Sequence, residues 1–294
     1  MFKKLSCLGC KILQNEPLSA HSSFKIGGAA DFFIEISNEN ALMEFLKIAS
    51  ENGLKYFILG GGTNILFSDT GYRGAIIKLV GDFKKIKIKD EEIYCGSGAL
   101  LTAVLKKAAE NRLCGLQCAA GIPGTVGGAV FGNAGDKSGF IGAAVKSIEI
   151  IDFNGFEKKI LKENNLPSFE YRKSGLENCI ITKVNFLLKK EAGNGILKEI
   201  LESVKKRAKN QPMAMPCAGC IFKNPAGFSA GRLIDEAGLK GTRTGGAEIS
   251  EIHANFIVNF GGAKSKDVLE LISLAEKAVK EKFNIDLELE IKIV

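Results

Sequence analysis

The chain of 294 residues contains no tryptophan and no apolar stretch long enough to cross a membrane. The segment from Met1 to Cys10 is basic but lacks the apolar core of a secretory signal peptide, which favours a cytoplasmic location. The sequence has no internal repeat and no low-complexity tract. What remains is the composition of an ordinary globular protein, 46% apolar and 25% charged, with enough length for two or three domains.

No aromatic residues are interleaved with the basic clusters at 84–89, 189–190 and 205–207, which contribute to the net charge of +7. Proteins that bind nucleic acid commonly place aromatic side chains among basic ones, so that bases can stack on them. We therefore expect neither a nucleic acid nor a membrane as partner. The positive charge instead favours small anionic ligands.

The eight cysteines are expected to be free thiols, because a cytoplasmic location disfavours disulfides. Two pairs, Cys7/Cys10 and Cys217/Cys220, have the Cys-x-x-Cys spacing of zinc knuckles and thiol redox modules. The pairs lie far apart in the sequence and lack the surrounding turns of such knuckles. We expect no metal site, and a colourless zinc or thiol module remains the non-enzymatic alternative.

The most unusual segment is 121–135, in which six of fifteen residues are glycine although Ile122, Val126, Val130 and Phe131 keep it apolar. A flexible linker would be polar, so these glycines indicate a backbone that passes close to something or adopts positive φ. A helix that begins at Thr125 would add N–H groups suited to a phosphate or pyrophosphate. The alternative is a tightly packed glycine corner without a ligand.

A second glycine turn, 60–64, follows a predicted strand at 32–36, a helix capped by Asn38 and ended by Gly53, and a strand at 56–59. This order is typical of an α/β phosphate site, but the glycines do not match the Rossmann spacing. Further on, Asn154-Gly155 predicts a type I′ hairpin between 148–153 and 156–161.

The last third of the chain has three helical patterns and one strand pattern. The helical patterns are a helix with Ile196, Leu197, Ile200, Leu201 and Val204 facing inward, a short one over 230–237, and an amphipathic one over 267–283. Strict alternation predicts a strand over 285–294, with Asp286, Glu288, Glu290 and Lys292 on its polar face.

Six motifs, taken in order, resemble the UDP-N-acetylenolpyruvoylglucosamine reductase family over about residues 19–292. They are 23–28, 60–64, 121–135, Tyr171-Arg172-x-Ser174, 220–225 and Leu287-Glu288-x-Glu290. The resemblance implies an α+β fold, with a two-domain FAD-binding unit of the p-cresol methylhydroxylase/vanillyl-alcohol oxidase type and a C-terminal α+β substrate-binding domain. We expect the domains to span 1–78, 79–208 and 209–294, the last strand returning Glu290 to the active site.

The resemblance also implies the reaction. NADPH would reduce bound FAD, and UDP-N-acetylglucosamine enolpyruvate would be reduced to UDP-N-acetylmuramate in peptidoglycan precursor synthesis. The short spacing between Arg172 and Cys220 resembles the subclass without an inserted tyrosine loop. We expect a monomer. Another FAD oxidoreductase of the same fold, such as an alcohol oxidase, is the enzymatic alternative, because a fold does not fix a function.

The family's catalytic residues match Arg172, Cys220 and Glu290. The Arg172 guanidinium fits the substrate carboxylate, on which charge develops, and Glu290 would help to stabilise the enol intermediate. Cys220 stands where the family carries a serine as proton donor, and a thiol is a much stronger acid than a hydroxyl, with an unperturbed pKa of about 8.5. Each residue also has a non-catalytic alternative: Arg172 could be an ordinary surface arginine, Glu290 a solvated carboxylate and Cys220 a buried structural cysteine.

Binding residues follow from the same motifs. The two glycine segments would wrap the FAD pyrophosphate through backbone N–H groups. Separately, this chain has Asn210 at a position where relatives often have a basic residue. The cofactor-binding residues are Gly60, Gly61, Gly62, Thr63, Asn64, Gly121, Ile122, Pro123, Gly124, Thr125, Gly127 and Gly128; Tyr171, Lys223 and Asn224 would contact the substrate.

Overall fold

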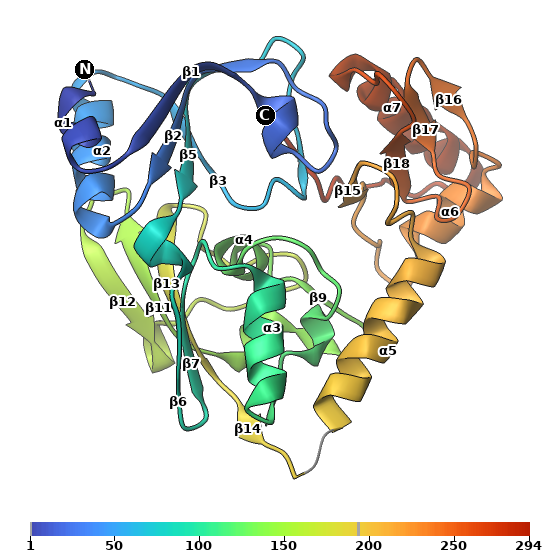
Figure 1. Cartoon of the computed structure of the whole chain (residues 1–294). Coiled ribbons are helices and arrows are strands. Elements are labelled where there is room, and N and C mark those ends of the chain that lie inside the picture. Colours follow the sequence, from blue (N-terminus) through green and yellow to red (C-terminus); the bar gives the residue numbers. More distant parts are fainter. Residues whose placement is uncertain (1, 193–194) are drawn as a thin grey trace. The chain divides into compact units, whose positions relative to one another are not determined.

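The computed structural model describes residues 2–192 and 195–294, and the chain divides into two compact units. Figure 1 shows their helices and strands, coloured along the sequence. Each unit is assembled from three separate segments of chain. Unit 1 comprises the segment up to Gln14, Phe32–Gly61 and Gly74–Lys205, whereas unit 2 comprises Asn15–Asp31, Gly62–Arg73 and Lys206–Val294. The three-domain division expected from the sequence stays a prediction.

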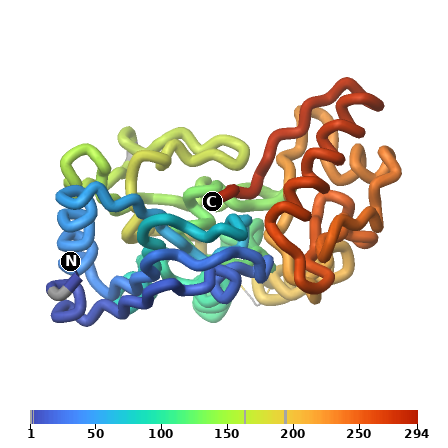
Figure 2. Tube along the Cα trace, turned by 90° about the horizontal axis from the view of Figure 1, so that it is seen from above, coloured from blue at the N-terminus to red at the C-terminus, as the bar shows by residue number. Residues whose placement is uncertain are grey.

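The first sheet has the strand order β1-β2-β5-β3, and its strands β3 and β5 are parallel. Helix α2 (Glu39–Glu51) begins after Asn38, whose side chain accepts a hydrogen bond from the Ala41 N–H. Helix α1 (Lys3–Cys7) packs beside α2, as the blue segments of Figures 1 and 2 show. The predicted cap, helix and strands are thus confirmed. The strands are β1 (Lys11–Pro17), β2 (Ala29–Ile36), β3 (Tyr56–Leu59) and β5 (Tyr72–Leu79).

The second sheet of unit 1 is antiparallel throughout, in the order β12-β11-β13-β7-β6. Helices α3 (Leu101–Glu110) and α4 (Val126–Phe131) contribute to the same apolar core as this sheet. The glycine-rich segment is therefore built into the core of the unit and is not a surface linker. The strands are β6 (Ile86–Lys89), β7 (Glu92–Gly96), β11 (Val145–Asp152), β12 (Lys158–Lys162) and β13 (Cys179–Leu187).

Unit 2 contains an antiparallel sheet in the order β15-β18-β17-β16, packed with helices α6 (Ala230–Glu236) and α7 (Ser265–Phe283) around one core. Both helices were predicted, and both are confirmed. The α+β class is confirmed as well, because largely antiparallel sheets and helices build both units. The strands are β15 (Cys217–Cys220), β16 (Arg243–Thr244), β17 (Ala247–Ile249) and β18 (Phe256–Asn259).

Shorter elements complete the fold. Two-residue strand pairs are formed by β8 (Leu113–Cys114) with β14 (Lys189–Lys190), β9 (Gly135–Asp136) with β10 (Gly139–Phe140), and β4 (Ile65–Leu66) with β19 (Lys292–Ile293). The 3₁₀ helices are Leu18–His21, Gly81–Lys84, Gln117–Ala119, Ile141–Ala144 and Glu163–Asn165.

The hairpin of β11 and β12 is present, but the predicted type I′ turn at Asn154-Gly155 is wrong. Positive φ occurs one position later, at Gly155 (81°) and Phe156 (54°), and the loop closes where the Asp152 N–H donates to the Glu157 carbonyl. The Asp152 carboxylate also accepts from the Asn154 N–H at 2.8 Å. This local side-chain bond favours the longer loop over a two-residue turn.

Helix α5 (Gly195–Asn210) forms where the sequence predicts it, but the prediction that its apolar residues face inward is wrong. Ile196 alone in this helix is buried, whereas Leu197 is 53% and Leu201 50% exposed. The helical period shows which residues share a face, and it does not show whether another element covers that face.

The predicted strand over 285–294 is wrong for most of its length. Only β19 is a strand, and upstream of it a single bridge joins Phe222 to Leu289. The alternation still matters, since Ile285, Leu287, Leu289 and Ile291 contact the core of unit 2. Residues 288–290 bond to residues 221–223, whereas residues 292–293 pair with β4, so the segment forms no continuous strand with one partner.

Within residues 2–192 and 195–294, no helix combines the length and the apolar character that a membrane crossing requires. All eight cysteines are free thiols, as predicted. The same residues contain no group of three or more His, Cys, Asp or Glu side chains arranged to hold a metal ion.

Candidate active site

The two glycine segments, some sixty residues apart in sequence, meet inside unit 1 at the start of α4. Thr125 is the N-cap of this helix, and its side chain accepts from the Gly128 N–H. A Cβ atom built on Gly60 would lie only 2.8 Å from Thr125 Oγ1 and 3.9 Å from Gly128 Cα. The predicted helix start at Thr125 is confirmed, and the close approach that the glycines indicated is the contact between these two segments.

Part of the glycine segment 121–135 serves packing. The N–H groups of Val126 and Gly127 donate to the carbonyls of Ala99 and Ser97, at 2.9 and 2.8 Å. A Cβ on Gly127 would lie 2.7 Å from Ser97 Cβ, so only glycine allows α4 to approach the segment before α3 this closely. The Gly127 N–H therefore already has a partner within unit 1.

Other donors at the same place remain for a ligand. In the described part of the chain, no acceptor faces the N–H groups of Gly61, Gly124 and Thr125. Ser97 Oγ is also buried without a hydrogen-bond partner there, and it lies beside Gly127. Buried polar groups normally have partners, so this set of donors fits the phosphate oxygens of a dinucleotide. The residues present thus fit FAD.

Tyr171 and Arg172 occupy the tip of a tight turn in unit 1. Glu170 and Lys173 exchange two backbone hydrogen bonds, of 3.0 and 3.2 Å, which close the turn. Arg172 has a φ of 55°, in the left-handed region that non-glycine residues rarely adopt. Such strain is retained where the surroundings fix it, and it is common at functional sites.

The Arg172 side chain is half-buried and held from two sides. Its Nη2 donates to the Gly135 carbonyl at 3.3 Å, and its guanidinium carbon lies 5.1 Å from the centre of the Tyr171 ring. The Tyr171 ring in turn packs edge-on against Phe140. Both Gly135 and Phe140 belong to the segment that follows α4, so the predicted catalytic arginine rests on the end of the predicted FAD segment.

In unit 2, Cys220 ends strand β15 at an irregularity. Three steps along β15, from Cys217 to Cys220, face two steps along β18, from Val258 to Phe256, and Gly219 has a φ of 79°. Bulges of this kind redirect a side chain and are frequent beside active sites. The Cys220 side chain is half-buried. At the other end of β15, burial raises the pKa of the Cys217 thiol above its ordinary value.

The backbone of Glu290 lies next to that of Cys220. The Glu290 N–H donates to the Ile221 carbonyl at 2.8 Å, and the Asn64 side chain donates to the Glu290 carbonyl at 2.9 Å. Three of the predicted site residues, Asn64, Cys220 and Glu290, are therefore brought together in unit 2. Glu290 is half-buried, whereas Glu288 is exposed.

The two predicted substrate contacts of unit 2 have different surroundings. Lys223 pairs through Nζ with the carboxylate of the exposed Glu288, and its N–H donates to the Glu288 carbonyl. Asn224 Oδ1 accepts from the Ala230 N–H at the start of α6, at 3.0 Å. The Lys223 ammonium thus pairs with an exposed carboxylate, whereas the Asn224 side chain bonds to the backbone at the start of α6.

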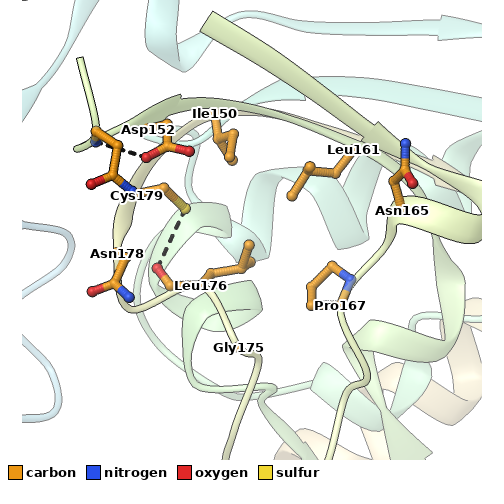
Figure 3. Close-up of a pocket in the computed structure, with 10 residues that line it drawn as sticks. Ile150, Asp152, Leu161, Asn165, Pro167, Gly175, Leu176, Asn178 and Cys179 are labelled. Atoms are coloured by element: carbon orange, nitrogen blue, oxygen red, sulfur yellow. Dashed lines mark hydrogen bonds between the residues drawn. The ribbon is translucent and has the colours of Figure 1, made fainter. Parts of the chain in front are cut away.

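A depression in unit 1 is lined by residues of β11, β12 and β13 and of the segments on both sides of the Tyr171–Arg172 turn (Figure 3). Pro167 and Gly175 form one side of it, and within it Cys179 Sγ donates to the Leu176 carbonyl. None of the predicted site residues lines it.

Sequence reasoning missed two buried asparagines at the site. Asn133 is 1% exposed, and its amide bonds to Gly142 and Glu170 in unit 1. Asn255 is 3% exposed and bonds through its side chain to both the N–H and the carbonyl of Phe222, two residues after Cys220. Asn133 lies in the glycine-rich segment 121–135, but only the fold shows what either amide binds.

Comparisons with known proteins match both parts of the chain. Residues 30–159 match the model of an FAD binding domain, and residues 211–294 match that of the C-terminal domain of UDP-N-acetylenolpyruvoylglucosamine reductase. The reductase of that name from Bacillus licheniformis is 39% identical, over 97% of this chain and 94% of its own. The one from Moorella thermoacetica is 40% identical over the same shares. A crystal structure of the reductase from Thermus caldophilus is similar with a TM-score of 0.82 and 38% identity, and covers 97% of this chain and 98% of its own.

Proposed function

Because this chain belongs to the UDP-N-acetylenolpyruvoylglucosamine reductase family, we propose that it reduces UDP-N-acetylglucosamine enolpyruvate to UDP-N-acetylmuramate with NADPH and bound FAD. The observation that carries this reaction is the similarity to reductases of that name over 97% of the chain. The FAD binding domain model, over residues 30–159, and the family's C-terminal domain model, over residues 211–294, agree with this reaction.

FAD would be held mainly by backbone. The N–H groups of Gly61, Gly124 and Thr125 and the Ser97 hydroxyl support this proposal, because none of them has a hydrogen-bond partner in the described part of the chain. When bound, FAD supplies hydride transfer from NADPH to the vinyl carbon of the substrate. The other cofactor-binding residues remain proposals on the motif match: Gly60, Gly62, Thr63, Asn64, Gly121, Ile122, Pro123, Gly127 and Gly128.

Arg172 would bind the substrate carboxylate and stabilise the negative charge that hydride addition places on it. A guanidinium suits this role because it stays charged and meets a carboxylate with two parallel hydrogen bonds. Its anchored position, with the Gly135 carbonyl on one side and the Tyr171 ring on the other, supports the proposal. A donor fixed before the reaction costs no reorganisation when the charge appears.

Cys220 would donate the proton to the carbon next to the one that receives hydride, and the backbone of Glu290 runs directly beside it. Glu290 would hold the developing enol through a shared proton, which requires a protonated carboxyl or a neighbouring donor. The bulge in β15 and the hydrogen bonds that fix Glu290 to Ile221 and Asn64 support these roles, because they hold both backbones in place.

Tyr171, Lys223 and Asn224 would contact the nucleotide sugar. The chain's exchangeable Lys223–Glu288 pair supports a diphosphate contact at Lys223, since a phosphate can replace an exposed carboxylate. We further propose that the enzyme acts as a monomer in the cytoplasm, which light scattering and cell fractionation would test.

An anaerobic stopped-flow experiment tests the proposed function. The purified protein should be yellow, NADPH should bleach the flavin, and the enolpyruvyl substrate should then restore the colour. An alcohol substrate in place of the enolpyruvyl compound is the control for the oxidase alternative. If the reduced flavin fails to reoxidise on addition of the enolpyruvyl substrate, the proposed reaction is wrong.

A further inference from the structure

Asn133 follows α4 directly and uses its whole side-chain amide inside unit 1. Its Oδ1 accepts from the Gly142 N–H at 3.1 Å, and its Nδ2 donates to the Glu170 carbonyl at 2.7 Å. The residue is 1% exposed and has a φ of 41°, a left-handed conformation that asparagine tolerates better than most residues. Its amide therefore joins two segments that are far apart in the sequence.

Asn133 donates to the carbonyl of Glu170, and Glu170 is the first residue of the turn that carries Tyr171 and Arg172. A second support of that turn comes from the same place, since Arg172 Nη2 donates to the Gly135 carbonyl, two residues after Asn133. Gly142 also belongs to this contact: a Cβ there would lie 2.5 Å from the Phe169 ring and 2.8 Å from Asn133 Oδ1. The approach is thus close enough to require glycine.

Helix α4 connects this anchor to the proposed FAD site. Thr125 and Gly60 meet at its first turn, and Asn133 follows its last one. A six-residue helix is about 9 Å long. The Asn133 amide and this short helix therefore connect the arginine turn to the start of α4.

We propose that Asn133 is a positioning residue for the reduction: its amide holds the strained Tyr171–Arg172 turn so that the guanidinium keeps the orientation that the substrate carboxylate needs. The inference rests on the proposed role of Arg172 in the substrate half-reaction. Misplacement of a catalytic group by about 1 Å can slow a reaction about 10²-fold, so a lost positioning bond has a measurable kinetic effect.

Two variants separate this role from folding. Asn133→Gly removes the amide while keeping a residue suited to the φ of 41°. Asn133→Asp keeps an acceptor for the Gly142 N–H but sets a carboxylate oxygen against the Glu170 carbonyl. Asn185→Ala is the matched control, because Asn185 is also a buried asparagine of unit 1 (8% exposed), and its amide binds Glu92 instead of the turn.

In both Asn133 variants, reoxidation of the NADPH-reduced flavin by substrate should slow about 10- to 100-fold, while flavin content and reduction by NADPH stay within about twofold of wild type. The Asn185 control should leave both half-reactions near wild type. In an Arg172→Ala background, Asn133→Gly should have no further effect on the substrate half-reaction, because the group it positions is gone.

Each contrary outcome has a distinct meaning. If Arg172→Ala alone leaves the substrate half-reaction unchanged, the proposed role of Arg172 is wrong. If Arg172→Ala is slow but Asn133→Gly slows it further by the same factor as in wild type, Asn133 does not act through the arginine and the inference is overturned. Equal loss in both half-reactions, or loss of flavin in Asn133→Gly, likewise overturns it in favour of a structural role.

Discussion

Gly60→Ala should weaken FAD binding through one steric contact whose size the structure gives. The added Cβ would lie 2.8 Å from Thr125 Oγ1, whereas ordinary contact begins at 3.4 Å, so about 0.6 Å (3.4 − 2.8) of displacement is required. The backbone of Gly60 has no positive φ, so the substitution adds crowding without conformational strain. Crowding of this kind costs about 1–3 kcal/mol in a packed site.

If that cost falls on the cofactor site, the dissociation constant for FAD should rise about 5- to 140-fold, since 1.4 kcal/mol is tenfold. Titration of deflavinated protein with FAD, followed by flavin fluorescence, measures the change directly. Gly132→Ala is the matched control, because its Cβ would make an ordinary 3.5 Å contact at the other end of α4.

A second substitution tests whether the contact with Thr125 is the cause. Thr125→Ala removes Oγ1 and weakens the helix cap by about 0.5–2 kcal/mol, but it also removes the atom that the new Cβ meets. The double variant should therefore bind FAD more tightly than the sum of the two single effects predicts. Unchanged FAD affinity in Gly60→Ala, or strictly additive effects, would refute the assignment of this contact to the cofactor site.

The other predictions concern chemistry and thiol reactivity. Arg172→Lys keeps the charge but loses the paired donors, so flavin reoxidation by substrate should slow by orders of magnitude while flavin reduction by NADPH is little changed. Equal losses of rate in both half-reactions, measured by stopped flow, would exclude a contact between Arg172 and the substrate carboxylate. Cys220→Ser should retain activity without the alkaline decline expected of a titrating thiol, and Cys220→Ala should be about 10²–10⁴-fold slower than wild type. If wild type and Cys220→Ser have the same pH profile and Cys220→Ala is fully active, Cys220 is a structural cysteine. Glu290→Gln should impair substrate reduction far more than Glu288→Gln, and the reverse order in steady-state assays would contradict the motif assignment. Burial raises the pKa of Cys95 to about 12, so its thiolate is scarce at pH 8 and mass spectrometry should find it unmodified by iodoacetamide under native conditions; rapid labelling would contradict its burial.

Local elements were predictable because their causes lie within a few residues. Asn38 caps α2 by a bond to the N–H of Ala41, and Thr125 caps α4 by a bond to the N–H of Gly128. Each acceptor sits three residues before its donor, so the sequence pattern contains the whole interaction. The same holds for the apolar stripe of α7, whose core side is set by the helical period.

The mistakes arose where a second segment of chain decides the outcome. The alternation in 285–294 correctly selects the residues that contact the core, but it cannot reveal that the segment pairs first with Phe222 and then with β4. Likewise, the period of α5 shows that Leu197 and Leu201 share a face, yet both are about half exposed. A pattern records the chain's own preference and not the presence of a neighbour.

Motifs and periodicity are properties of short segments, so the order of amino acids was enough to indicate the fold class and the family and to predict the site residues. Which of those residues meet depends on the folded chain. Gly60 touches Thr125, Asn64 holds Glu290, and Asn133 holds the turn of Arg172 through contacts between distant segments. Such contacts depend on backbone positions that the packing of a whole core fixes, and no short window of sequence contains them.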